Sequence, residues 1–167
     1  MRCRSLLPLA LSICAGAVPA WAATIVSVTR IPRPDGAGSV ATAHISGDGR
    51  YVSFARTSSP RVAYVYDRET KEVTPAAKST SGGTPDGSTV VHQLSYDGRF
   101  LILESTASDL VEGISPSYLS AYVYDRQAET AVLASATDDG QPADGPVYHL
   151  QLADDGQAAV FSVKAPN

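Results

Sequence analysis

The sequence has few residues for covalent or metal cross-links, and these lie within its first 22 positions. Both cysteines, Cys3 and Cys14, and the only tryptophan, Trp21, belong to that segment. Without it, the chain has neither a disulfide nor a cysteine ligand for a metal, so packing and hydrogen bonds must hold the fold. We therefore expect a core of Val, Leu, Ile, Tyr and Phe, with no metal and no cofactor.

Basic residues are also scarce. The 13 Lys and Arg against 17 Asp and Glu give a formal charge of −4, which becomes −6 without Arg2 and Arg4. This balance lacks the basic surface that nucleic-acid binding needs. The carboxylates are spread among polar turns, which is typical of a solvated surface.

Familiar catalytic motifs are missing from the sequence. There is no Gly-x-Ser-x-Gly nucleophile elbow, no His-Glu-x-x-His zinc motif, no phosphate-binding loop and no Gly-x-Gly-x-x-Gly fingerprint. The Asp-Gly segments also lack the spaced carboxylates of an EF-hand. These absences favour a non-catalytic protein.

The first 22 residues have the features of a secretory signal peptide. Arg2 and Arg4 precede an apolar run at 6–18, and the small-x-small segment at 20–22 predicts cleavage near Ala22. The run is too short for an ordinary membrane span, so we expect none after cleavage. A lipoprotein signal at 11–14 is the alternative, which the bulky residue before the cysteine disfavours. We predict a periplasmic or secreted bacterial protein.

One pattern of eleven residues occurs three times. It reads HISGDGRYVSF at 44–54, QLSYDGRFLIL at 93–103 and, more loosely, QLADDGQAAVF at 151–161. Each copy places an Asp-Gly pair between two short apolar runs. This predicts a hairpin, because glycine accepts positive φ and Asp can hydrogen-bond within its own turn. The predicted structural turn residues are Asp48, Gly49, Asp97, Gly98, Asp155 and Gly156.

The pentapeptide Tyr-Val-Tyr-Asp-Arg follows this hairpin twice, at 64–68 and at 122–126. Its β-branched and aromatic residues predict a third strand, with both tyrosines of each copy on one face. We interpret these tyrosines as structural. We expect Asp67 and Asp125 to cap the turns that follow rather than to act as catalytic acids.

Four short strands in a repeat of about fifty residues are typical of a β-propeller blade. The predicted fold class is all-β: an incomplete β-propeller with two full four-stranded antiparallel blades, at 40–75 and 88–135, and partial blades at each end. The last strand of a preceding blade is predicted at 24–29, and two strands of a further blade at 147–163. Together they form one domain at 23–167.

The segments ISGDGRYVSF, LSYDGRFLIL, STASDLVEGI and AYVYDR resemble the TolB-like, WD40-like β-propeller repeats of bacterial exported proteins. The resemblance implies the propeller fold, and it leaves function open. The same repeat occurs in periplasmic scaffold proteins, sugar-lyase-like proteins and propeller domains of peptidases. One departure concerns the turn between the third and fourth strands, where the family usually has glycine and this chain has Glu69-Thr70-Lys71 and Glu129-Thr130.

The eleven strands that we predict are too few for a closed propeller, which needs four to eight blades. Three interpretations remain: a fragment of a longer gene product, a short open array, or several copies that complete a ring. We favour the fragment, because the sequence stops within a blade. Open blade edges also allow self-association.

The candidate ligand-binding residues are His44, His92 and His149. All three lie on the predicted innermost strands, which line the central channel of a propeller, although no histidine recurs at one repeat position. The alternative is a polar filler on a partly wet strand. Metal binding by several of them requires adjacent blades to converge.

The densest acidic group lies in turn-rich sequence and is most simply solvated. A cation site at a blade rim is the alternative interpretation. Its members are Asp138, Asp139, Asp144, Asp154 and Asp155.

These observations predict an exported, non-catalytic binding or scaffolding module whose repeat surface binds a protein or a glycan. The alternative is a fragment of a propeller-containing enzyme, either an accessory domain of a peptidase or a lyase-type propeller. The functional expectation depends on analogy at the level of the fold.

Overall fold

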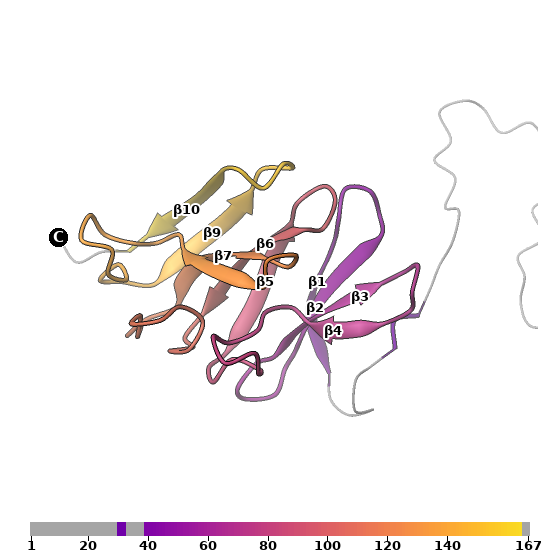
Figure 1. Ribbon diagram of the computed structural model, residues 1–167, viewed down its shortest axis with the longest axis horizontal. Helices are drawn as coiled ribbons and strands as arrows, with labels where there is room; N and C mark the ends of the chain where they lie inside the picture. Colours follow the sequence, from indigo (N-terminus) through magenta and orange to yellow (C-terminus); the bar gives the residue numbers. More distant parts are fainter. Residues whose placement is uncertain (1–29, 33–38, 165–167) are drawn as a thin grey trace, which may run out of the picture. The chain divides into compact units, whose positions relative to one another are not determined.

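The computed structural model describes residues 30–32 and 39–164. The predicted signal peptide at 1–22, its cleavage near Ala22 and the predicted strand at 24–29 lie outside these residues. Every regular element described is a β-strand, and the described part contains no helix able to cross a membrane. The chain is all-β, as the sequence predicts (Figure 1).

Three antiparallel sheets follow one another along the chain (Figure 1). In each sheet, neighbouring strands are consecutive in sequence. The first sheet contains β1 (Val40–Ile45), β2 (Tyr51–Arg56), β3 (Ala63–Asp67) and β4 (Val73–Pro75). The second contains β5 (Thr89–Leu94), β6 (Phe100–Ser105), β7 (Ser120–Asp125) and β8 (Thr130–Leu133), and the third contains β9 (Val147–Leu152) and β10 (Ala159–Val163).

The Asp-Gly turns join the first two strands of each sheet, and in the first two sheets they do so by the same set of bonds. In the second sheet, Ser95 Oγ donates to Asp97 Oδ1 at 2.7 Å, and Asp97 Oδ1 also accepts from the Arg99 backbone N–H at 3.0 Å. Gly98 takes a left-handed φ of 68°, which glycine adopts without steric cost. The first sheet repeats these bonds, whereas Ala153 in the third sheet has no hydroxyl to supply the serine bond.

The arginine after each of the first two turns clamps the aspartate that ends the third strand. Arg99 binds Asp125 through two nitrogens, with Nη2 2.6 Å from Oδ2, and Arg50 binds Asp67 in the same way at 2.7 Å. Each aspartate also accepts backbone N–H bonds from the turn that follows it. The arginine hydrogen bond is the main reason that the pKa of each carboxyl falls from 3.8 to about 2. Both carboxylates therefore belong to the framework of the blade.

The turns between the third and fourth strands contain non-glycine residues in a left-handed conformation. Lys71 has a φ of 67° and Glu129 a φ of 56°. These positions lie in the segment where the resembled family usually has glycine. Side chains are disfavoured by about 1 kcal/mol or more in this region, so both turns are held by the strands that they connect.

Adjacent sheets pack face to face through equivalent contacts. One apolar cluster joins the first sheet to the second, with Val65 and Leu101 among its members, and another joins Ile102 to Leu150 of the third sheet. A Cβ added to Gly98 would lie 2.3 Å from the Tyr51 ring. The sheets thus form consecutive blades of an incomplete β-propeller, and those described do not close into a ring.

Candidate functional site

The structure brings two of the three candidate histidines together on neighbouring inner strands. His44 lies on β1 and His92 on β5, and these two strands pack against each other. His92 Nε2 is 3.2 Å from Glu104 Oε2 on β6, and the carboxylate is the more buried partner. Both histidines are half-buried. The site therefore combines two imidazoles and one carboxylate from adjacent blades.

The electrostatics of His44 reflect this environment. Burial lowers its pKa below 6.5, and the positive charge that His92 can carry lowers it further. The neutral imidazole is therefore favoured for His44 in the fold, mainly because a cation there loses hydration. A neutral imidazole both donates and accepts hydrogen bonds, which suits a polar ligand.

Glu104 escaped the sequence analysis. It is the only acidic residue in the apolar strand Phe100–Ser105. A single carboxylate in an apolar strand is the feature of the sequence that could have indicated a functional residue. Its proximity to His92 depends on the pairing of β5 with β6, in which Val90 is the direct partner of Glu104 and the register shifts at His92. Bulges of this kind re-aim side chains, so spacing in the sequence alone does not bring the pair together.

His149 occupies a separate position on β9. Its Nδ1 lies 3.1 Å from Ser162 Oγ on β10, and its backbone has a left-handed φ of 56°. Thr42 on β1 is left-handed as well, with a φ of 49°. Among the described residues, no ion pair or hydrogen bond joins His149 to His44 or His92.

Glutamine replaces histidine at the position of His44 in the other two sheets, and Gln93 shows what that position does. Its side-chain amide donates to the Leu152 carbonyl at 2.8 Å and accepts from the Leu152 N–H at 3.0 Å. Gln93 thereby links the second sheet to the third. The His44 ring cannot donate to and accept from one backbone residue as the Gln93 amide does. The first sheet is therefore not linked to the second by an amide bridge of this kind.

The arrangement does not form a metal centre in the part of the chain that the structure describes. No group of three or more His, Cys, Asp or Glu side chains is placed there to hold a metal ion. The chemical capacity of His44, His92 and Glu104 is hydrogen bonding and exchange of a proton with a bound polar group.

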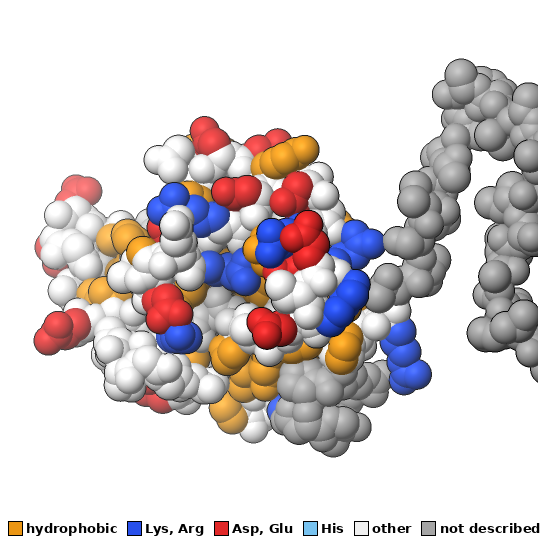
Figure 2. Space-filling model, turned by 45° about the vertical axis from the view of Figure 1, so that its right-hand side comes forward, with side chains coloured by type: hydrophobic (Ala, Val, Ile, Leu, Met, Phe, Trp, Pro, Cys, Tyr) orange, Lys and Arg blue, Asp and Glu red, His pale blue; other side chains and the backbone are white. Residues whose placement is uncertain are grey.

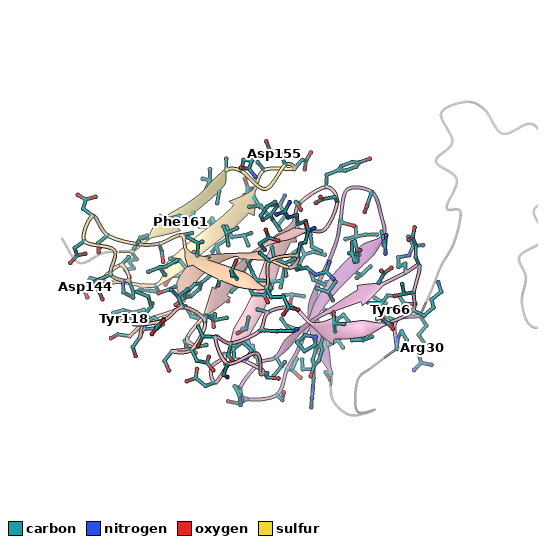
Figure 3. All side chains as sticks on the ribbon, in the orientation of Figure 1. Arg30, Tyr66, Tyr118, Asp144, Asp155 and Phe161 are labelled. Atoms are coloured by element: carbon teal, nitrogen blue, oxygen red, sulfur yellow. The ribbon has the colours of Figure 1, made fainter. Side chains whose placement is uncertain are left out.

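The acidic residues of the sequence analysis are distributed over several turns. Figure 3 shows Asp155 in the turn between β9 and β10 and Asp144 near the opposite end of that sheet. Asp139 accepts from the Thr137 hydroxyl, which is the main reason that its pKa is lowered, and Asp155 accepts from the Gln157 N–H at 2.9 Å. These bonds are those of capped polar turns.

The predicted turn residues occupy the hairpins described above. Asp48, Asp97 and Asp155 each accept a backbone N–H bond two residues on. The glycines that follow them all have φ between 68° and 74°. Each pair therefore has a local structural role in its own sheet.

A groove of about 470 Å³ is lined by the connection between β4 and β5, the connection between β6 and β7, and the turn that leads into β8. The ion pair between Lys78 and Glu129 crosses it, and the Lys78 N–H donates to Tyr124 Oη at 3.2 Å. On the face shown in Figure 2, basic and acidic side chains lie next to one another. Because Lys78 and Glu129 pair with each other, this groove is a weaker candidate than the histidine pair.

Comparisons with known proteins give structural neighbours only. No family model and no curated protein matches the chain. It is similar to the tricorn protease, with 17% identity and a TM-score of 0.49 over 74% of this chain and 11% of that one. It is also similar to a TolB from Agrobacterium tumefaciens, with 12% identity and a TM-score of 0.47 over 75% of this chain and 39% of that one. A TolB from Acinetobacter baumannii shows 13% identity and a TM-score of 0.32 over 77% and 38%. The chain thus spans well under two thirds of each neighbour.

Proposed function

We propose that this chain is an exported, non-catalytic binding module of the TolB-like propeller type, whose inner strands present a polar site to a protein or a glycan. The observation that carries the proposal is the convergence of His44, His92 and Glu104 from two adjacent blades. In propellers the inner strands surround the central channel. A half-buried polar cluster there offers directional hydrogen bonds to one part of a larger ligand.

The recurring charged pairs support this assignment because they serve the framework. The bidentate pairs Arg50–Asp67 and Arg99–Asp125 recur in the first two sheets with the same geometry. A pair that recurs at each blade supports the fold wherever it occurs. The histidine cluster does not recur, so the architecture of the repeat does not require it.

The alternative function, a fragment of an enzyme, draws on the contact between His149 and Ser162. In a catalytic pair, histidine removes the serine proton. Here Ser162 Oγ donates its proton to the Tyr148 carbonyl at 3.2 Å, so this proton is not directed at the His149 ring. The contact is therefore suited to holding β9 and β10 together.

Arrays of defined oligosaccharides and peptides test the binding proposal. We expect the purified chain to retain a subset of probes, and His92→Ala to reduce that retention at least about tenfold, the loss of one strong hydrogen bond. Val132→Ala, on the exposed part of β8, is the control and should bind as the wild type does. Retention unaffected by His92→Ala would place binding elsewhere, and cleavage of a retained probe would establish the enzyme alternative.

Export is tested separately by cell fractionation. Expression in a bacterium with both membranes should release a chain that begins at Ala23, which N-terminal sequencing detects. A cytoplasmic chain that retains Met1 would contradict this part of the proposal.

A further inference from the structure

The two contacts between neighbouring sheets are successive copies of one interface. Leu94 on β5 is 3% exposed because it packs in the cluster shared with the first sheet, and Leu152 on β9 is 4% exposed in the cluster shared with the second. Both leucines stand four residues before the glycine of their turn. In each sheet this position therefore contacts the sheet that precedes it.

The equivalent residue of the first sheet is Ile45, and it is 58% exposed. Leu94 and Leu152 are almost completely buried, whereas Ile45 at the same position is in contact with water. Tyr64, the counterpart of the fully buried Tyr122, is only half-buried. The face of the first sheet thus retains the side chains of a blade contact and lacks a blade to cover it within the described residues.

The third sheet shows the complementary half of the same interface. Ile102 on β6 is 0% exposed because it packs against the third sheet, whereas its counterpart Val160 on β10 is 68% exposed. Gln151, the counterpart of Gln93, is exposed and forms none of the amide bonds that Gln93 makes to Leu152. The third sheet therefore presents an apolar side chain and an amide in the arrangement that the second sheet uses to bind its successor.

We propose that a second copy of this chain docks head to tail on the first, so that its first sheet covers the third sheet of its neighbour. Val160 then packs beside Ile45 of the second copy, and the Gln151 amide reaches the backbone of that isoleucine. The argument is the continuity of one interface that the chain already forms twice. The two residues that it uses on the third sheet, Gln151 and Val160, lie on β9 and β10.

Such a contact joins two different surfaces, so it extends to further copies. Rotation from copy to copy gives a ring if it closes and a filament if it does not. The inference is independent of the ligand proposed for the histidine cluster, because its readout is the mass of the assembly and not the retention of a probe.

Sedimentation velocity of the purified chain over a range of concentrations tests this proposal. We expect the wild type to associate as concentration rises, and Ile45→Glu and Val160→Glu each to weaken association at least about tenfold, since both bury a carboxylate at the contact. Val132→Glu is the matched control, because Val132 is 66% exposed but lies on neither terminal face. It should associate as the wild type does.

Mixing the two variants provides the decisive measurement. Ile45→Glu retains an intact third sheet, and Val160→Glu retains an intact first sheet, so an equimolar mixture should form a dimer and nothing larger. A wild type that stays monomeric at all concentrations overturns the proposal. Association that persists in both single variants, or a mixture that stays monomeric while the wild type associates, overturns it as well.

Discussion

The second sheet has turn and strand sequences similar to those of the first and third sheets, but it is packed between them. Tyr-Val-Tyr-Asp-Arg occurs in both the first and the second sheet, and the arginine–aspartate clamps have the same geometry. Tyr122 is nevertheless fully buried and Tyr64 half-buried. Within the described residues, the second sheet is covered on both faces, and the first and third sheets on one face each. Local sequence thus sets the turns, whereas neighbouring sheets set the burial.

The largest difference should appear when equivalent apolar residues are shortened. Ile102→Ala removes a fully buried side chain and should lower the free energy of unfolding by about 3 kcal/mol. Val160→Ala at the same place in the third sheet should cost less than about 0.5 kcal/mol. Urea unfolding at low protein concentration measures both. Equal losses would show that the third sheet is covered in solution even when the chain is dilute.

The turn glycines provide a second contrast. A Cβ on Gly98 would lie 2.3 Å from the Tyr51 ring, whereas the nearest atom to a Cβ on Gly49 is Arg68 Nη1 at 3.7 Å. Both glycines have positive φ, so alanine costs about 1 kcal/mol at either position. Gly98→Ala should cost roughly 1 kcal/mol more, because the ring must move. Thermal unfolding of the two variants checks the order, and a greater loss for Gly49→Ala would contradict the packing contrast.

The two clamped aspartates should behave alike, since their contacts are local. Their pKa values are lowered from 3.8 to about 2, so the stability they contribute is complete above pH 3.8 and is lost as pH falls toward 2. The exposed arginines and salt limit the effect to roughly 1 kcal/mol for each pair. Asp67→Asn and Asp125→Asn should each reduce, by the same amount, the loss in free energy of unfolding that occurs as pH falls below 3.8. Unequal effects would show that the surrounding sheets influence even the turns.

The surroundings of the Tyr122 hydroxyl on β7 also differ from those of its counterpart Tyr64 on β3. It is buried without a hydrogen-bond partner among the described residues, and burial raises the pKa of Tyr122 to about 12. Tyr122→Phe should therefore leave stability unchanged or raise it by up to about 1 kcal/mol. Tyr64→Phe, on the half-exposed counterpart, should change little. Chemical unfolding measures both, and a clear loss in Tyr122→Phe would show that its hydroxyl has a partner in solution.

The smallest effect concerns His44, which takes the place of a glutamine. Because its pKa is lowered from 6.5, mainly by burial, the fold binds fewer protons there than the unfolded chain does. Stability should therefore decrease as pH falls through about 6.5. His44→Gln should remove that decrease, seen by comparing unfolding at about pH 7.5 and about pH 5. An unchanged pH dependence would assign the decrease to another group.

Much of the fold is accessible from the sequence because it depends on short-range bonds. The turn at Asp97 is formed by atoms within five residues, and the apolar run that follows it in the predicted hairpin forms β6. Alternation of apolar residues then gives four strands for each blade. These features follow from residue type and spacing alone.

The candidate site is less accessible because it depends on contacts between strands. The approach of His92 to Glu104 requires a bulge on β5, and its neighbour His44 comes from another blade. The left-handed conformations of Lys71 and Glu129 are similarly hidden, because no local rule places a charged residue there. Histidine positions were visible in the sequence, whereas their partners were not.

The contact of Gly98 with Tyr51 has the same form as that of Gly156 with Phe100, and this repetition bears on how such a gene can change. A duplicated blade inserted between two existing blades would contact the aromatic ring of the blade before it and the turn glycine of the blade after it. At this contact its product would need no compensating substitution at either junction. Unequal recombination can therefore lengthen or shorten the array by whole blades in a single step.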